Sequence, residues 1–125
     1  LAEQGVTYCG DWNNDDQPYR MNVGGRQLVY LPYSYEINDS PQLYYRDRSI
    51  DEFETMIKRQ FDVLYREGER SGRVMAICLH PFIIGVPHRI GGLDSALKYI
   101  CGHPNVWKAT GEEIVKAYLA SGAKL

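Results

Sequence analysis

Apolar residues recur at helical spacing in the middle of the chain and form one stripe. The stripe consists of Ile50, Phe53, Ile57, Phe61 and Leu64. It is preceded by Ser49-Ile50-Asp51-Glu52, a capping box whose serine and glutamate can satisfy each other's backbone amides. Gly68 is expected to end the helix. The pattern predicts an amphipathic helix from Ser49 to Gly68 whose apolar face covers a flat apolar surface.

Shorter apolar runs predict strands at residues 5–9, 27–32, 73–79 and 106–109. The run at 73–79 is almost unbroken, as in a strand covered on both faces. A second helix should place Leu93, Ala96, Leu97 and Ile100 inward and end near Gly102, and a last helix should run from the capping box Thr110–Glu113 to about Ala120. Residues 11–19, 33–48 and 80–92 are predicted loops. This alternation predicts an α/β fold with mostly parallel strands, covering helices and functional groups at the carboxyl ends of the strands.

Composition narrows the class of protein. The 125 residues are 44% hydrophobic and 24% charged, which fits one domain spanning residues 1–125. The net charge is −2 and the basic residues are scattered, so nucleic acid is not an expected partner. Apolar runs are too short to cross a membrane. Three cysteines without a C-x-x-C pair favour a reducing, cytoplasmic compartment. Because the chain begins with Leu1, we expect it to be a piece of something longer.

His80 is the first candidate for chemistry, because it directly follows the predicted buried strand 73–79 and precedes Pro81. Its side chain should emerge at the carboxyl end of the sheet, where α/β proteins build their sites. A histidine there can donate or accept a proton near neutral pH. It can equally cap the strand by bonding a neighbouring carbonyl, and its position alone does not separate the two roles.

Acidic residues follow the first predicted strand. Asp11, Asp15 and Asp16 lie close in sequence and could share a space with Glu36 and Asp39 of the next loop. Crowded carboxylates can hold a metal, orient a histidine, or act as acid and base. Runs of Asp and Asn are more often solvated turn formers, and by sequence alone that interpretation is favoured.

Aromatic residues concentrate in the first part of the chain. Seven of the ten tyrosines lie between Tyr8 and Tyr45, with Trp12 beside them. Such rings suit the walls of a groove for a polar, ring-shaped substrate. They can also pack long loops or form a protein interface.

The remaining histidines give weaker signals. His88 and Arg89 lie in the predicted loop with Phe82, Ile83 and Ile84, which could be a lid, an anion clamp or, as we favour, an oligomer contact. His103 precedes Pro104 at a helix end and is interpreted as structural. The histidines lack zinc-site spacing, and no phosphate-binding glycine loop or G-x-S-x-G turn occurs in the sequence.

Four segments together resemble the polysaccharide deacetylase (NodB-homology) superfamily, in the branch of allantoinase-like and cyclic-imide-hydrolase-like enzymes and an atypical peptidoglycan deacetylase. They are Asp11–Tyr19 (DWNNDDQPY), Leu31–Asp39 (LPYSYEIND), Leu79–Arg89 (LHPFIIGVPHR) and Val106–Ile114 (VWKATGEEI). The resemblance implies a distorted (β/α) barrel and hydrolysis of a carbon–nitrogen bond other than a peptide bond, in an N-acetylated saccharide, a cyclic amide or a ureide.

The resemblance also implies roles for residues. His80 matches the general acid that protonates the leaving nitrogen, and Asp15 and Asp16 would help to orient it. Substrate-binding roles are expected of Trp12, Tyr19, Tyr35, Glu36, Asn38 and Asp39. The family's catalytic base and its metal-binding aspartate and two histidines have no matching segment here.

The chain therefore resembles the carboxyl-terminal portion of such a barrel. We expect it to be incomplete as a catalyst and to need the amino-terminal half, or exchange between protomers of a homo-oligomer, because a divided barrel exposes strand edges. A divalent metal in the complete barrel would have its ligands outside this chain. The alternative is an incomplete product that serves as a saccharide-binding or protein-interaction module.

Overall fold

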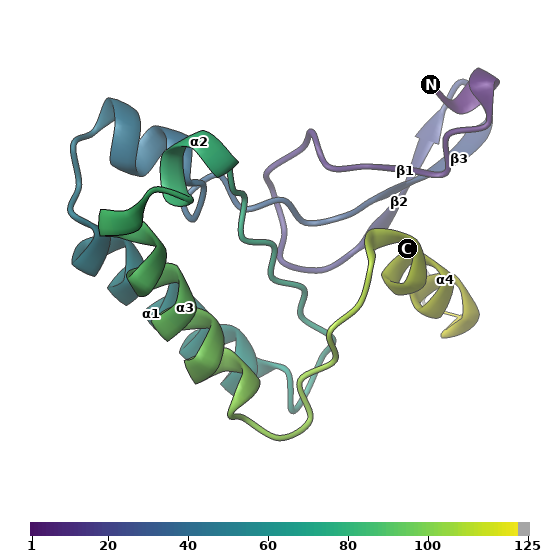
Figure 1. Cartoon of the computed structure of the whole chain (residues 1–125). Coiled ribbons are helices and arrows are strands. Elements are labelled where there is room, and N and C mark those ends of the chain that lie inside the picture. Colours follow the sequence, from purple (N-terminus) through teal and green to yellow (C-terminus); the bar gives the residue numbers. More distant parts are fainter. Residues whose placement is uncertain (123–125) are drawn as a thin grey trace.

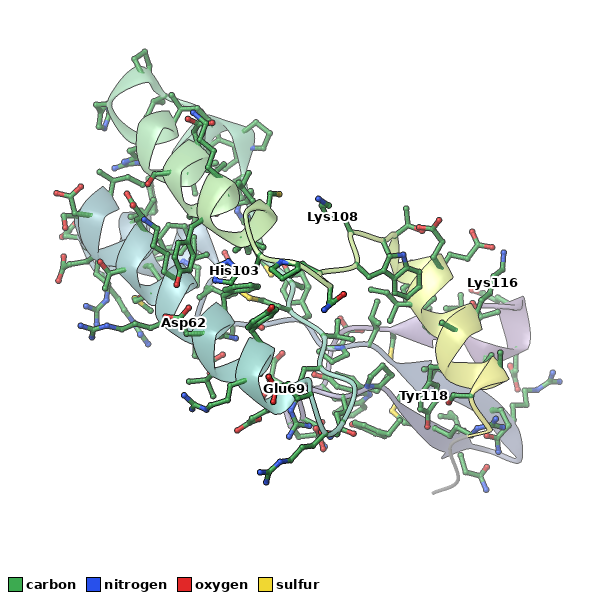
Figure 2. All side chains as sticks on the ribbon, turned by 90° about the horizontal axis from the view of Figure 1, so that it is seen from below. Asp62, Glu69, His103, Lys108, Lys116 and Tyr118 are labelled. Atoms are coloured by element: carbon green, nitrogen blue, oxygen red, sulfur yellow. The ribbon has the colours of Figure 1, made fainter. Side chains whose placement is uncertain are left out.

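The computed structural model describes residues 1–122, which form a helical layer and a small sheet that extended segments connect (Figure 1). The helical layer contains a π-helix η2 (Ser40–Tyr45), α1 (Ile50–Glu67), α2 (Pro81–Ile84) and α3 (Pro87–Cys101). The sheet contains β1 (Tyr8–Cys9), β2 (Tyr19–Val23) and β3 (Arg26–Tyr30), preceded by a 3₁₀ turn η1 (Ala2–Gln4). Helix α4 (Gly111–Ala120) lies beside the sheet, away from the other helices (Figures 1 and 2).

The sheet has the strand order β1-β3-β2. β1 pairs with β3 in parallel, and β2 pairs with β3 in antiparallel fashion as a hairpin. The hairpin turns at Gly24 and Gly25, both at positive φ (59° and 79°), which suits a two-residue turn that matches the strand twist. Asn22 secures the turn, because its Oδ1 accepts the Gly25 N–H at 3.0 Å. Strand β2 was not predicted from the sequence.

The hydrophobic core lies in the helical layer. The apolar stripe of α1 is buried there as predicted, but chiefly against α3 rather than on a flat apolar surface. Phe53 and Ile57 of α1 are fully buried, and Ala96 of α3 packs in the same cluster. The two helices approach closely at Gly92, where a Cβ atom would lie 2.4 Å from Cγ1 of Ile50. Leu97, which we expected inward, is 41% exposed. None of the helices in the described range has the length and apolar content of a membrane span.

His103 closes the far end of the helix pair. Its Nδ1–H donates to the carbonyl of Tyr99 at 2.8 Å. Its ring packs edge-on against Phe61, Tyr65 and Tyr99, which come from both helices. Figure 2 shows this histidine at the junction of α1 and α3. These contacts agree with the structural role expected for His103.

Both capping boxes are present as predicted. Ser49 Oγ accepts the Glu52 N–H, and Thr110 Oγ1 accepts the Glu113 N–H. Each glutamate carboxylate accepts the N–H of its capping residue in return, at 2.8 Å for Ser49 and 2.7 Å for Thr110. These hydrogen bonds lower the pKa values of Glu52 and Glu113.

Loss of the first cap gives a measurable prediction. Ser49→Ala should lower the free energy of unfolding by about 1 kcal/mol, because the Glu52 N–H at the start of α1 loses its hydroxyl acceptor. Urea unfolding followed by circular dichroism measures the change. Thr110→Ala is the matched variant at α4, which carries less of the core, so its effect should be smaller; a larger effect at Thr110 would contradict this view of the fold.

Two predicted strands are extended but do not form regular ladders. Residues 73–79 pair with another segment through a single parallel bridge between Cys78 and Asn38, and the Val74 N–H donates one more hydrogen bond to the Asp16 carbonyl. Residues 73–77 are only partly buried, so the prediction of a strand covered on both faces is wrong. Residues 106–109 carry no strand assignment either. A ladder needs a partner strand alongside, and residues 1–122 supply none for these two segments beyond that single bridge.

Two predicted loops are partly helical. Residues 33–48 contain η2, and residues 80–92 contain α2 and the first turns of α3. Ile83 and Ile84 are buried at 3% exposure each, so this segment is not the exposed apolar loop that we expected. His88 and Arg89 lie in the first turn of α3, and Arg89 Nη1 donates to the Ile83 carbonyl at 3.1 Å. Ile83 and Ile84 are therefore not available for the oligomer contact that we expected at this segment.

Candidate active site

The site is built where two segments far apart in sequence run in parallel. Asn38 and Cys78 form the parallel bridge. The Cys78 N–H donates to the Ile37 carbonyl, and the Asp39 N–H donates to the Cys78 carbonyl at 3.0 Å. The bridge sets the register, so the next residue on each segment, Asp39 and His80, also lie side by side.

Asp39 holds the His80 side chain in a fixed orientation. Its Oδ2 accepts the backbone N–H of His80 at 2.7 Å, and its Oδ1 lies 2.7 Å from Nδ1 of the imidazole. A carboxylate can only accept, so Nδ1 carries the proton in this contact. The Asp39 side chain is 0% exposed, whereas the His80 side chain is 38% exposed. The second ring nitrogen, Nε2, is therefore left for an external partner.

The structure shows which group the His80 ring bonds. A structural cap would bond a backbone carbonyl, but the ring bonds a buried carboxylate. Such hydrogen bonds to an ionised group are short and strong. A histidine held through Nδ1 by a carboxylate can carry a proton on Nε2 and deliver it in one direction.

Cys78 and Tyr33 lie next to the Asp39 carboxylate and stay neutral at ordinary pH. Burial raises the pKa of the Cys78 thiol. The hydrogen bond with Cys78, together with burial, raises the pKa of Tyr33 to about 12. The Cys78 Sγ–H also donates weakly to the Ser34 carbonyl at 3.6 Å. Neither of these two groups is therefore a candidate for proton transfer near neutral pH.

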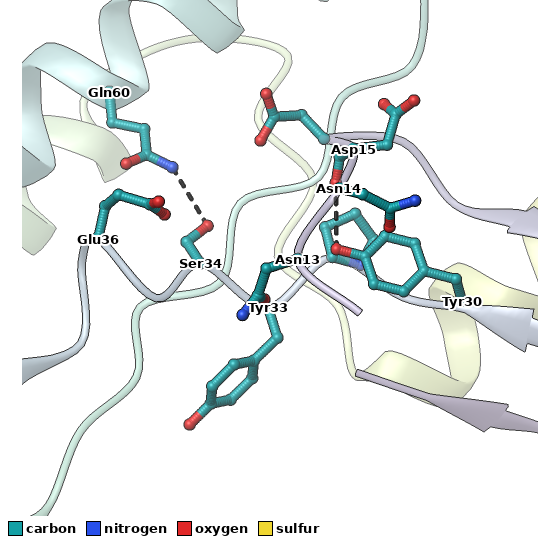
Figure 3. Close-up of a pocket in the computed structure, with 10 residues that line it drawn as sticks. Asn13, Asn14, Asp15, Tyr30, Tyr33, Ser34, Glu36 and Gln60 are labelled. Carbon is teal, nitrogen blue, oxygen red and sulfur yellow. Dashed lines mark hydrogen bonds between the residues drawn. The ribbon is translucent and has the colours of Figure 1, made fainter. Parts of the chain in front are cut away.

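A cavity of about 360 Å³ opens beside the segment that leads to Asp39. Its lining is mostly polar and comes from the turn 13–16, the segment 30–36 and α1. Figure 3 shows Gln60 of α1 reaching toward Ser34, with a 3.1 Å hydrogen bond, and Glu36 beside this pair. On the other side the Tyr30 hydroxyl donates to the Asp15 carbonyl at 3.2 Å (Figure 3).

The predicted site residues fall into two groups. Asp15, Asp16 and Glu36 line the cavity together. Asp39, rather than Asp15 or Asp16, makes the contact with the His80 imidazole. The catalytic roles of Asp15 and Asp16 therefore stay predictions, and the orienting carboxylate belongs to a residue that we had expected to bind substrate.

The other predicted substrate-binding residues differ in how exposed their side chains are. Trp12 and Tyr35 are exposed, at 58% and 48%. Tyr19 begins β2, stacks on Tyr30 at 4.6 Å between ring centroids, and donates to Asn14 Oδ1 at 2.6 Å. Asn38 is nearly buried, and its Oδ1 accepts the Ser40 N–H at 3.1 Å, which makes its role at least partly structural.

The donor set of this chain does not fit a metal ion on its own. Among residues 1–122 no group of three or more His, Cys, Asp or Glu side chains is arranged to hold one. Asp39 is already engaged by two hydrogen bonds from His80. We derive no step through a metal from these residues, and the expectation of ligands outside this chain stays a prediction.

Sequence comparison finds one close curated similarity. The chain is 34% identical over 124 residues to a protein named "putative polysaccharide deacetylase" of Schizosaccharomyces pombe. The match takes in 90% of this chain and 39% of that protein. No protein-family model matches the chain.

Solved structures show the same partial coverage. The chain superimposes on a probable polysaccharide deacetylase from Pseudomonas aeruginosa PAO1 with a TM-score of 0.83 and 30% identity, and on an allantoinase with a TM-score of 0.84 and 30% identity. The match takes in 94% and 95% of this chain and 40% of each structure. A putative polysaccharide deacetylase from Mycobacterium smegmatis shares the fold, with a TM-score of 0.84. The predicted fold class, part of a deacetylase-type barrel, is confirmed.

Proposed function

Because the chain is related in sequence and in fold to the polysaccharide deacetylase superfamily, over about 40% of the matched proteins, we propose that it is a portion of a carbon–nitrogen hydrolase. The bond cleaved is an amide other than a peptide bond. The observation that carries the proposal is the His80 imidazole, fixed through Nδ1 on a buried carboxylate with Nε2 open.

In the proposed reaction His80 is the general acid. Water adds to the amide carbonyl and gives its proton to a base. The tetrahedral intermediate then collapses: the C–N bond breaks, its electron pair goes to nitrogen, and nitrogen takes the proton from Nε2. An amide nitrogen is a poor leaving group unless it is protonated, so the acid contributes much of the rate. Asp39 stabilises the positive charge on the imidazole before this transfer.

The proposed substrate is an N-acetylated saccharide or a cyclic amide or ureide. These classes carry the hydroxyl, amide and carbonyl groups that Ser34, Glu36 and Gln60 can bond in the cavity. Trp12 and Tyr35 are exposed and free to pack on a ring. Asp15 and Asp16 are proposed to complete the polar wall. The similar proteins are named polysaccharide deacetylase and allantoinase, which supports these substrate classes.

The remaining portion of the barrel is the proposed partner. Residues 73–79 and 106–109 are extended without regular ladders, and Trp107 is 62% exposed. These features suit segments that pair with further strands. The partner portion would supply the base, and with it any metal ligands. It can come from the same polypeptide, from a second chain or from another protomer.

Complementation tests this proposal. The chain alone should release acetate from an N-acetylglucosamine oligosaccharide, or open hydantoin, at least about 10²-fold more slowly than the chain joined to the other barrel portion of a relative, because one of two proton-transfer groups is missing. Acetate release and hydantoin absorbance give the rates. Equal activity of the two forms would contradict the need for a partner, and no activity of the joined form would contradict the hydrolase.

A binding module is the second candidate. The exposed aromatic residues and the polar cavity do not depend on a base, so they favour ligand binding even without turnover. Saccharide binding by the joined form together with no hydrolysis would support this alternative over the enzyme.

A further inference from the structure

One aromatic side chain next to His80 is exposed although its helix is packed into the core. Helix α2 has four residues, Pro81 to Ile84. Ile83 and Ile84 are each 3% exposed and belong to the main hydrophobic cluster. Phe82 between them and Pro81 is 74% exposed. Phe82 is thus an exposed apolar side chain on a turn whose isoleucine side chains are buried.

The surrounding contacts fix where this ring can lie. Proline at the first helical position restricts the backbone, and the amides of Ile83 and Ile84 both donate to the His80 carbonyl, at 2.9 and 3.1 Å. Arg89 bonds the Ile83 carbonyl at the other end of α2. Hydrogen bonds hold this turn at both ends, and the buried side chains of Ile83 and Ile84 anchor it to the core. Phe82 therefore has little backbone freedom.

The ring of Phe82 lies against the imidazole. The two ring centroids are 5.7 Å apart and the planes are nearly perpendicular, at 69°. This is the edge-to-face arrangement that aromatic pairs favour. The contact uses a small part of the phenyl surface, since most of the ring stays exposed. An apolar surface therefore borders the His80 imidazole.

We infer that Phe82 is a specificity-determining residue that packs on the apolar face of a ring-shaped amide substrate while Nε2 of His80 meets the departing nitrogen. This inference rests on the proposed function. A pyranose presents C–H groups on one face and a hydantoin presents a flat ring, so both match a phenyl surface, whereas an acyclic amide offers no such face.

Coverage of Phe82 by a protein segment is the competing explanation. A segment that covered the phenyl ring would also lie over the adjoining imidazole, since the two rings are in contact. That would restrict access to Nε2, which is needed for chemistry. The position beside His80 thus favours a small-molecule ring over a protein partner.

Ligand binding by the chain joined to its barrel portion tests the inference. Calorimetry would measure the dissociation constants of an N-acetylglucosamine oligosaccharide, of hydantoin and of acyclic N-methylacetamide. Phe82→Ala should weaken the binding of at least one ring ligand about five- to tenfold, which is the size of one lost aromatic contact, and leave N-methylacetamide unchanged. Phe82→Tyr keeps the ring and should bind as the unchanged protein does. Val63→Ala, at an exposed position on α1, is the matched control.

Several results would overturn the inference. These are unchanged ring binding in Phe82→Ala, equal weakening of ring and acyclic ligands, or no ring binding by the unsubstituted protein. Because Phe82 is exposed, alanine should leave the fold intact, and circular dichroism checks this. The His80→Ala variant separates the two proposals. Full turnover by this variant would contradict the proposed hydrolase mechanism, whereas the binding of ring ligands by Phe82→Ala would still test the role of Phe82.

Discussion

Replacing His80 by alanine in the joined protein should lower kcat by about 10²–10⁴-fold, which is the usual contribution of a positioned proton donor. The imidazole is 38% exposed and makes one hydrogen bond to Asp39, while the backbone N–H that also bonds Asp39 is kept in alanine, so the substitution removes little packing. Substrate binding should change much less than kcat, because the cavity side chains stay in place. Steady-state kinetics with the acetylated oligosaccharide gives both constants.

The control for this prediction is a histidine that the reaction does not use. His88 is exposed in the first turn of α3, and His88→Ala should keep the activity of the unsubstituted protein. Turnover by His80→Ala within a few-fold of the unsubstituted protein, with the fold intact, would remove the catalytic role.

Replacing Asp39 by asparagine should have the second largest effect, on both activity and stability. The amide oxygen can accept only one of the two donors of His80, and the NH₂ group then faces the other. Leaving a buried donor unpaired costs about 1–3 kcal/mol of unfolding free energy. Turnover should fall about 10²-fold or more, because the imidazole loses its fixed tautomer and its counter-charge.

A spectroscopic measurement separates positioning from mere stability. In the unsubstituted protein, ¹⁵N NMR of the His80 ring should show the neutral form protonated on Nδ1, as the Asp39 contact requires. Asp39→Asn should lose this preference. Asp94→Asn is the matched control, since its carboxylate pairs with Lys98 on the surface. An unchanged His80 tautomer in Asp39→Asn would contradict the positioning role.

Local patterns predicted the helices well. The stripe from Ile50 to Leu64 and the capping boxes at Ser49 and Thr110 depend on residues three and four apart, so the sequence alone carries the signal. The hairpin between β2 and β3 was not predicted, although the Gly24-Gly25 pair is a recognisable turn signal. Residues 19–23 (YRMNV) also alternate between apolar and polar side chains, so the sequence carries a strand signal there as well.

Features that depend on pairing between distant segments could not be predicted from the sequence. The apolar run 73–79 is typical of a strand in a covered sheet, but its burial depends on neighbours that residues 1–122 do not provide. The position of His80 at the end of that run was predicted from the pattern. Its partner Asp39 lies 41 residues away, and only the register of the Asn38–Cys78 bridge brings them together. No sequence spacing points to that contact.

The exposure of Phe82 could not be predicted from the sequence either. An apolar Phe-Ile-Ile run looks uniform in sequence, and we expected it to be exposed as a loop. The structure buries both isoleucines and leaves Phe82 exposed, because α2 turns one face to the core. A single helical turn is too short to be recognised from periodicity.

The most direct test of His80 as proton donor is the dependence of its effect on the leaving group. The ratio of kcat in the unsubstituted protein to kcat in His80→Ala would be measured for a series of acetamides with progressively less basic leaving nitrogens. A nitrogen that departs easily needs no acid, so the ratio should fall steadily toward one along the series. A ratio that stays large and constant would show that His80 acts in some other way, and the mechanism built on it would be wrong.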